Sequence, residues 1–425
     1  MIKIIKADEL DPVRAAICQT SDKITAAVAD IIANVQKRGD DALRDYTSEF
    51  DGCCIDELEV PRTDIEASIN EIGPGFVGVL ERAAYNIKEY HRNQIRRDFV
   101  FYPREGVTLG QRIQPLDRVG IYIPGGTAAY PSCMLMNCIP AKLAGVREII
   151  LVTPPSKDGS VNAGILAAAK IAGADRVFRI GGAQAIAALA YGTESVPRVD
   201  KITGPGNVFV TEAKRQVFGV VGIDMLAGPS DILIIADDSS DPELVAADML
   251  SQCEHGESSA AILVTVSAEL AEKVKVEVET QLSALPRESI TRQAVYNHSK
   301  IIIADSIDQA FDIANDHAPE HLEIFLNEPF SYLEKVKNAG SVFLGKNSPV
   351  ALGDYYAGPN NTLPTSGTAR FSSPLSVDDF IKKSSYTYYS SEALNETGDD
   401  IIAFAEKEGL AAHALSVARR IKPRI

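Results

Sequence analysis

Residues 117–126 read DRVGIYIPGG, an apolar β-type run that ends in a proline and two glycines. Three further runs have the same character: EIILVTPP (148–155), DRVFRIGGAQAIAALA (175–190) and DKITGPGNVFV (200–210). Strand, glycine turn and helix therefore alternate through this part of the chain. The alternation predicts a doubly wound parallel sheet whose glycine turns, at the carboxyl ends of the strands, form a ligand crevice.

A second set of apolar runs follows: DILIIAD (231–237), AAILVTVS (260–267), KIIIADS (300–306) and GSVFLG (340–345). Helical segments again connect the runs. We therefore predict an α/β fold with two Rossmann-like, incompletely doubly wound domains. The expected divisions are a helical N-terminal region that joins the second α/β domain (1–110), a first Rossmann-like domain (111–230), a second one (231–375) and a helical tail (376–425).

The two ends of the chain are expected to differ from this pattern. Residues 24–50 place apolar residues on one recurring helical face before Asp51 and Gly52 break the helix. The last fifty residues show no strand set of their own, so the tail must pack on another surface, and we expect a partner subunit to provide it. We expect His91, which lies among charged residues, at the surface. His298 is expected in a loop.

The acidic composition limits the classes of partner. The chain has 58 acidic against 42 basic residues, and its formal net charge of −16 disfavours nucleic acid and anionic membranes. No secretory signal and no stretch of membrane-spanning length is visible. The six cysteines show no CxxC spacing, so we expect reduced thiols, with Cys133 and Cys138 as small buried residues. A cytoplasmic protein that binds a small polar or cationic ligand fits these features.

The segment SSDPELVAADMLSQCEHG (239–256) has the start signals of a helix, a cap at Asp241 followed by Pro242. Gln252 and His255 would then share one helix face, where an amide carbonyl and an imidazole can bind one cation such as zinc. Glutamine is an uncommon zinc ligand, however. A surface histidine near a helix C-terminus explains the pattern at least as well.

The cluster HAPEH (317–321) has the spacing of an inverted zinc-peptidase motif, so a zinc metallopeptidase of the HxxEH type is the alternative function. Pro319 opposes this alternative, because an interior proline costs roughly 3 kcal/mol and breaks the helix that both histidines would share. We expect the preceding helix to begin at a capping box at Ser306 and to end before the proline. Glu320 and His321 could then act as bases, one for water and one for an alcohol proton. An exposed polar turn has equal weight.

Taken together, these segments resemble the histidinol dehydrogenase family over nearly the whole chain. The resemblance rests on ten segments in order: DRVGIYIPGG, GGAQAIAALAYGT, ITGPGNVFV, EAKRQV, AGPSD, ADMLSQCEHG, APEHLEI, GDYYAGPN, LPTSGTAR and EGLAAHALSV. It implies an NAD-dependent, four-electron oxidation of L-histidinol through L-histidinal to L-histidine, the final step of histidine biosynthesis. It also implies one zinc ion per subunit, which anchors the substrate, and an intertwined homodimer with shared active sites.

The resemblance also assigns roles to residues of this chain. The zinc ligands match Gln252, His255, Asp354 and His413, the last from the neighbouring subunit. The two bases match Glu320 and His321. Further substrate contacts match Ser230 and Glu408, and they also include Gln252, His255, His321, Asp354 and His413. The NAD contacts match Tyr122, Gln184 and Asn207, in the domain over 111–230.

Three positions depart from the usual family pattern. Asn361 stands where a histidine is frequent, Tyr356 replaces a small residue, and Asp231 replaces a glutamate. None of the glycine clusters is a complete GxGxxG fingerprint, so NAD would bind without the usual pyrophosphate cradle. No assigned ligand or base is missing, which favours an active enzyme.

Overall fold

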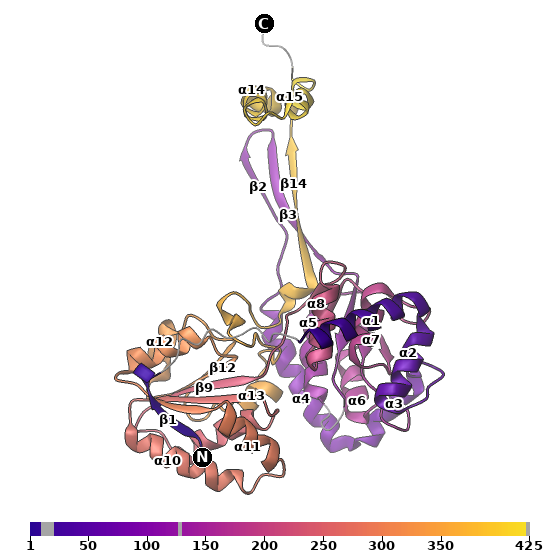
Figure 1. Cartoon of the computed structure of the whole chain (residues 1–425). Helices are drawn as coiled ribbons and strands as arrows, with labels where there is room; N and C mark the ends of the chain where they lie inside the picture. Colours follow the sequence, from indigo (N-terminus) through magenta and orange to yellow (C-terminus); the bar gives the residue numbers. More distant parts are fainter. Residues whose placement is uncertain (10–20, 126–129, 422–425) are drawn as a thin grey trace. The chain divides into compact units, whose positions relative to one another are not determined.

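The computed structural model describes residues 1–9, 21–125 and 130–421. It divides into two compact units, Met1–Gln94 with Leu116–Phe380 and Ile95–Pro115 with Ile381–Ile425 (Figure 1). Cys18 and part of the first glycine turn, residues 126–129, lie outside the described residues. No described helix is long and apolar enough to cross a membrane.

The first predicted sheet is present in the larger unit. Its five parallel strands have the order β6-β5-β4-β7-β8. They are β4 (Arg118–Tyr122), β5 (Glu148–Val152), β6 (Arg176–Phe178), β7 (Lys201–Thr203) and β8 (Gly222–Ile223). The chain order reverses between β4 and β7, so a crevice is expected at the carboxyl ends of these two strands.

Helices cover both faces of this sheet. One face shares a core with α1 (Asp22–Arg38), α2 (Asp40–Tyr46), α7 (Gly182–Tyr191) and α8 (Val208–Val217). The other shares a core with α3 (Arg62–Glu71), α4 (Gly73–Arg92), α5 (Pro131–Ala144) and α6 (Ala163–Ala172). The N-terminal helices thus pack on the first sheet, although we expected residues 1–110 to join the second domain. An amphipathic pattern predicts that a helix face is buried, but it does not identify the sheet that covers it.

The second sheet has six parallel strands in the order β1-β11-β10-β9-β12-β13. They are β1 (Lys3–Lys6), β9 (Asp231–Ala236), β10 (Ala260–Thr265), β11 (Lys300–Ile303), β12 (His321–Phe325) and β13 (Ser341–Leu344). Residues 1–110 were expected to join this second domain, and of their described elements β1 is the one that lies in this sheet. β12, which was not predicted as a strand, lies beside β9 where the chain order reverses.

Helices also cover both faces of the second sheet (Figure 1). One face carries α9 (Pro242–Cys253), α10 (Ala268–Leu282), α11 (Glu288–Asn297) and α13 (Val350–Tyr355), and the other carries α12 (Ile307–His317). The short helical turns are η1 (Ala7–Glu9), η2 (Thr47–Asp51), η3 (Pro329–Lys335), η4 (Thr368–Arg370) and η5 (Val377–Phe380).

The local helix signals are confirmed. The Asp241 carboxylate accepts the Glu243 N–H at 3.0 Å, and the Ser306 hydroxyl accepts the Gln309 N–H at 3.1 Å. Helix α12 ends at His317, and Ala318 follows with a positive φ of 53°. The helix therefore stops before Pro319, as predicted.

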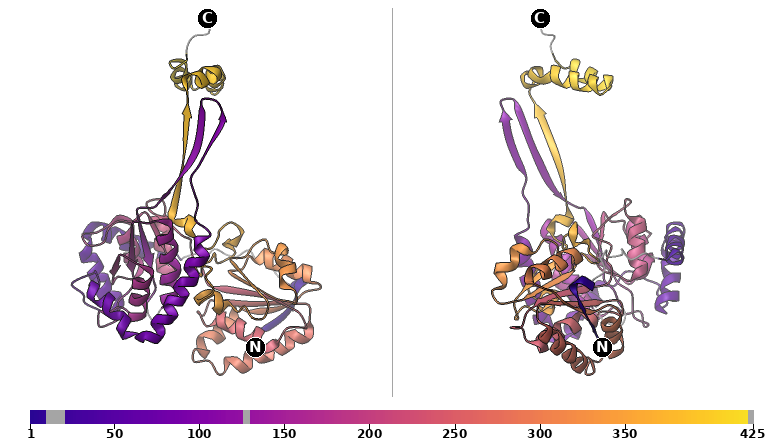
Figure 2. Two further views of the ribbon diagram at one scale, coloured as in Figure 1. Left: turned by 180° about the vertical axis from the view of Figure 1, so that it is seen from behind. Right: turned by 60° about the vertical axis from the view of Figure 1, so that its left-hand side comes forward.

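The smaller unit contains a three-stranded antiparallel sheet in the order β14-β3-β2 (Figure 2). Its elements are β2 (Phe99–Arg104), β3 (Val107–Pro115), β14 (Ile381–Tyr389), α14 (Ser391–Lys407) and α15 (Ala411–Ala418). The tail was expected to lack strands, and this expectation was wrong. The partner of β14 is β3, nearly three hundred residues earlier in the chain, and the expected boundary at residue 110 lies inside that strand.

Candidate functional site

The carboxylate and imidazole of the HAPEH segment lie at the amino end of β12. Helix α9 follows β9 and returns antiparallel to it, so its C-terminal end reaches the same edge of the sheet and brings Gln252 there. The five-stranded sheet instead contributes its carboxyl edge, through Tyr122 at the end of β4 and the turn after β7. Opposite edges of the two sheets therefore supply the candidate site residues.

Asp231, the first residue of β9, connects the polar groups at this edge. Its N–H donates to Glu320 Oε2 at 3.1 Å, and its Oδ1 accepts the Glu320 N–H at 3.2 Å. Its Oδ2 accepts a hydrogen bond from His317 Nε2 at 2.8 Å. The backbone oxygen of Asp231 lies 3.0 Å from His321 Nδ1. One residue thus orients both candidate bases.

These bonds determine the state of the His321 ring. A carbonyl oxygen only accepts hydrogen bonds, so Nδ1 carries the proton and Nε2 is the basic atom of the neutral ring. Nε2 is buried, has no hydrogen-bond partner among the described residues and lies 3.7 Å from Asp354 Oδ1. Burial lowers the pKa of His321, but the Glu320 and Asp354 carboxylates outweigh it and raise the pKa above its usual value.

Glu320 is 6% exposed, and burial is the main cause that raises its pKa to about 7. The carboxylates of Asp231 and Asp354 add to this effect, while the positive charge of His321 opposes it. A carboxylate with such a raised pKa is a stronger base than an ordinary glutamate. Both HAPEH candidates are therefore buried groups with shifted pKa values, and the exposed polar turn is excluded.

Gln252 and His255 lie at the C-terminal end of α9, and Asp354 lies near His321 and His255. Gln252 is 1% exposed, and neither atom of its amide has a hydrogen-bond partner among the described residues. His255 lies just after α9 rather than on it, although its N–H still donates to the Gln252 carbonyl at 3.3 Å. Its ring reaches water, but surrounding protein atoms desolvate it and lower its pKa, while nearby Asp354 raises that pKa.

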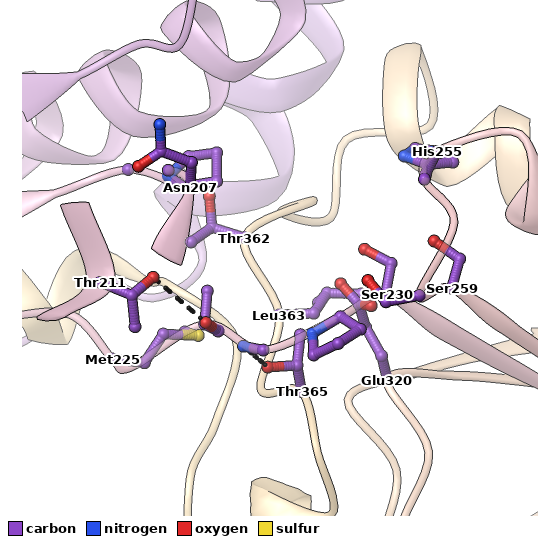
Figure 3. A pocket seen from close by; sticks show the side chains of 18 of the residues that line it. Asn207, Thr211, Met225, Ser230, His255, Ser259, Glu320, Thr362, Leu363 and Thr365 are labelled. Atoms are coloured by element: carbon purple, nitrogen blue, oxygen red, sulfur yellow. Dashed lines mark hydrogen bonds between the residues drawn. The ribbon is translucent and has the colours of Figure 1, made fainter. Parts of the chain in front are cut away.

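A cavity of about 450 Å³ extends from His255 and Glu320 to the turns of the first sheet (Figure 3). Ser230, Ser259, His255 and Glu320 line one side, and Asn207, Thr211 and Met225 line the other (Figure 3). The segment 361–365 forms a further part of the lining. Thr365 Oγ1 accepts the Gly228 N–H at 2.6 Å and so connects this segment to the AGPSD turn that carries Ser230.

Asn361, at the position where the resemblance implies a histidine, belongs to the cavity wall. Its Nδ2 donates to the Asp354 carbonyl at 3.1 Å, and its buried Oδ1 has no hydrogen-bond partner among the described residues. Asn361 therefore supports Asp354, the last residue but one of α13. The other departure, Tyr356, is exposed, and its backbone oxygen accepts Asn86 Nδ2 at 2.9 Å.

The turn after β7 is held by a buried ion pair. Lys214 Nζ contacts the Asp224 carboxylate and donates to the Gly204 carbonyl at 3.0 Å, while Asp224 Oδ2 accepts the Gly204 N–H at 2.8 Å. Gly204 has a φ of 110°, and a Cβ there would lie 2.0 Å from the backbone oxygen of Tyr122. Only glycine fits this position, which sets the path of the chain to Asn207.

The other two residues that the resemblance assigns to NAD lie at the same carboxyl edge. The Tyr122 hydroxyl accepts the Gly182 N–H at 3.3 Å, and burial raises its pKa to about 12. Gln184 is 1% exposed, and both atoms of its side-chain amide are without a partner among the described residues. Asn207 caps α8 through its Oδ1, so its Nδ2 is not used by the cap.

Glu408 and His413 lie in the smaller unit, and both are exposed. Of the four expected zinc ligands, the larger unit therefore contains Gln252, His255 and Asp354. No three His, Cys, Asp or Glu side chains of the described residues form a metal-binding group.

Sequence reasoning missed several residues of the site and misplaced one histidine. It gave no role to His317 or to the cavity residues Ser259 and Thr365, because polar residues in loops show no periodic pattern. His91 was expected at the surface but is fully buried in α4. Its Nδ1 donates to the Ile87 carbonyl at 2.8 Å, and its Nε2 accepts from Asn360 at 3.4 Å. His298 lies in an exposed turn, as expected.

A family model described as histidinol dehydrogenase matches residues 16–421. The chain belongs to the histidinol dehydrogenase family. It is 53% identical to a histidinol dehydrogenase of Clostridium acetobutylicum over 94% of this chain and 93% of that protein, and 51% identical to one of Listeria innocua over 95% and 94%. As a member of this family, the chain is an oxidoreductase.

Solved structures agree with this assignment. The crystal structure of histidinol dehydrogenase from Elizabethkingia anophelis matches with a TM-score of 0.94 and 38% identity, covering 99% of this chain and 98% of that one. An acetylating aldehyde dehydrogenase from Geobacillus thermoglucosidasius matches with a TM-score of 0.50 and 12% identity, over 88% and 93% of the two chains. The second match shows a likeness of fold alone.

The alternative function, a zinc metallopeptidase, is not supported. That motif needs both histidines one turn apart on a continuous helix. Here His317 is the last residue of α12, and His321 is the first residue of β12. His317 is instead bonded to Asp231. The family assignment and the positions of the two histidines therefore both exclude a zinc metallopeptidase.

The buried pair Lys214 and Asp224 allows a test of the turn after β7. We expect Lys214→Met to destabilise the protein by about 3–5 kcal/mol, because the Asp224 carboxylate would stay buried without its partner. The free energy of unfolding, measured by denaturant titration, gives the loss. The double variant Lys214→Met/Asp224→Asn should regain part of it, since no buried charge then remains. A double variant as unstable as the single one would contradict this account.

Proposed function

We propose that this protein oxidises L-histidinol through L-histidinal to L-histidine, with NAD as the hydride acceptor and a zinc ion that anchors the substrate. The observation that carries the proposal is the basic, unpartnered Nε2 atom of His321, which lies beside Glu320 and Asp354 and near His255. An alcohol oxidation needs a base at the hydroxyl group, and an aldehyde oxidation needs a second one for water. The cluster contains both.

The donor set fits a zinc ion. We propose Gln252, His255 and Asp354 as ligands, with His413 of a second subunit as the fourth. An unpartnered buried amide costs about 1–3 kcal/mol, so the Gln252 side chain is explained if its oxygen binds a cation. Amide oxygen, imidazole and carboxylate are all groups that zinc accepts. When bound, the ion would hold nitrogen atoms of histidinol and offset the negative charge of Asp354.

The carboxyl edge of the five-stranded sheet fits the dinucleotide. We propose that Tyr122, Gln184 and Asn207 contact NAD, and that the domain over 111–230 binds it. The free amide of Gln184 and the free Nδ2 of Asn207 offer hydrogen bonds that no described residue satisfies. NAD, when bound, would accept the hydride of each oxidation step.

The side chains of this protein have distinct roles in the proposed reaction. His321 Nε2 takes the hydroxyl proton while Nδ1 stays bonded to the Asp231 carbonyl, and Glu320 and Asp354 stabilise the imidazolium that forms. Glu320 then removes a proton from the water that adds to the aldehyde carbon. His321 acts again as the base in the second oxidation. We propose that Ser230, in the cavity wall, and Glu408 of the second subunit contact the substrate.

A homodimer with shared sites is also part of the proposal. The sheet of the smaller unit exposes Phe99 and Phe101 on one face and Val100, Tyr386 and Tyr388 on the other, and exposed apolar residues of this kind favour a protein partner. The ligand set is incomplete without a residue from that unit. The described cysteines are free thiols, which fits a reducing compartment, and we propose the cytoplasm.

The function is tested by the formation of NADH from NAD and L-histidinol in the presence of zinc. We expect NADH to form with the wild-type protein and His321→Asn to lower kcat by about 10²- to 10⁴-fold, because the general base is lost. The zinc content of the variant, measured by atomic absorption, should stay near normal. Full turnover by His321→Asn, or no NADH with the zinc-loaded wild type, would refute the assignment.

Glu320→Gln separates the two oxidation steps. We expect the oxidation of L-histidinal to slow more than that of L-histidinol, because only the aldehyde step needs a base for water. Single-turnover measurements started from each compound give the two rates. If both steps slow equally, Glu320 does not serve water specifically.

Mixed dimers test whether His413 acts on the neighbouring subunit. His255→Ala and His413→Ala should each be inactive alone, but after random reassembly we expect about a quarter of wild-type activity, since half of the dimers then hold one intact site. A separately tagged heterodimer, purified through both tags, should show half of the wild-type activity. No activity in the purified heterodimer would place all ligands in one chain.

A further inference from the structure

Two carboxyl groups, one buried and one partly exposed, meet beneath the candidate site. Glu323 lies on β12 and is 1% exposed, and Asp248 lies on α9. The two side chains are in hydrogen-bond contact with each other. Neither residue has a role in the proposed reaction, and neither was singled out by the sequence.

The hydrogen bonds of Glu323 show that this contact needs a proton. Its Oε1 accepts the Val350 N–H at 3.0 Å, whereas its buried Oε2 has no N–H or hydroxyl donor among the described residues. Two ionised carboxylates in contact would repel each other strongly in a buried place. A proton on one of them changes that repulsion into a short, charge-assisted hydrogen bond.

The surroundings favour this protonated state. Burial is the first cause that raises the pKa of Glu323 well above its usual value, and the Asp248 charge adds to it. Burial also raises the pKa of Asp248 to about 6. The other charged group that acts on Glu323 is His321, which lowers its pKa without reversing the shift.

Asp248, Glu323 and Val350 each lie next to a candidate site residue on the same face of their own element. Asp248 precedes Gln252 by one turn of α9, and Val350 precedes Asp354 by one turn of α13. Glu323 follows His321 by two residues, so both point to the same face of β12. Glu323 contacts both Asp248 and the Val350 N–H. These contacts therefore form a layer directly beneath Gln252, His321 and Asp354.

We propose that Asp248 and Glu323 share one proton and are positioning residues, which hold α9, β12 and α13 in register so that Gln252, His321 and Asp354 converge. The pair does not touch the substrate. It links the ligand-bearing ends of two helices to the strand that carries the base. The part of this inference that concerns metal affinity rests on the proposed zinc site, whereas the shared proton does not.

The test compares Glu323→Gln with Glu323→Met in the full-length protein. The glutamine can donate to Asp248 and still accept the Val350 N–H, so we expect zinc affinity within about threefold of wild type, whereas methionine should weaken it by about 10- to 100-fold. Competition between zinc alone and a chelator gives the affinity without any assay of activity. Asp248→Ala, on a partly exposed helix position, should match Glu323→Met even if that variant folds poorly.

The pH dependence of stability, measured without metal, tests the proton itself. A carboxyl whose pKa is raised by folding contributes stability that is complete below its unfolded pKa and is lost as the pH rises through its folded pKa. Asp248 titrates in both proteins, so their difference reports Glu323, whose pKa burial raises well above its ordinary value of 4.5. We therefore expect the melting temperature of wild type to fall relative to that of Glu323→Gln as the pH rises above 4.5.

The outcomes distinguish a failure of the inference about Asp248 and Glu323 from a failure of the proposed function. Unchanged zinc affinity in Glu323→Met and Asp248→Ala would overturn the positioning role, and so would a Glu323→Gln variant as weak as Glu323→Met. Parallel pH profiles of wild type and Glu323→Gln would overturn the shared proton. Wild-type protein that does not bind zinc would instead refute the zinc part of the proposed function, and the metal-free pH comparison would still decide the proton.

Discussion

The contact between the amino ends of β9 and β12 organises the whole candidate site. Asp231 uses its N–H, its carbonyl and both carboxylate oxygens to hold Glu320, His321 and His317. The two strands are neighbours because the chain order of the sheet reverses between them. A backbone carbonyl thus decides which nitrogen of His321 is basic, and a buried carboxylate next to it sets the charge that the ring can carry. These are properties of the strand pairing, since no other register would place Asp231 beside His321.

The two sheets contribute opposite edges, and this has a physical reason. In the five-stranded sheet the cavity lies at the carboxyl ends of the strands, where turns such as the one at Gly204 leave space for a ligand. In the six-stranded sheet the side chains come from strand starts and helix ends, because α9 runs antiparallel to β9 and delivers Gln252 to the amino edge. A chain of side chains beneath that edge, from Asp248 through Glu323 to α13, then relates the helices to the strand.

Two kinds of buried polar group lie around the proposed sites. His91 and Lys214 are buried with all their polar atoms bonded, so they stabilise the fold around the site. Gln184, Gln252 and His321 Nε2 are buried without a partner among the described residues, and they lie where NAD, zinc and substrate are proposed. A fold keeps such costly groups where a ligand completes them.

Sequence alone determined the α/β class, the strand and turn pattern, the helix caps at Asp241 and Ser306, the helix end before Pro319, and the family. These depend on residues close together in the chain, whose caps and periodicities act locally, and on the order of the motifs. Only the tertiary structure decided that α1–α4 pack on the first sheet, that β14 pairs with β3, that His91 is buried, and that Asp248 meets Glu323. A local pattern specifies that a face will be buried, but its partner lies tens or hundreds of residues away and is chosen by packing.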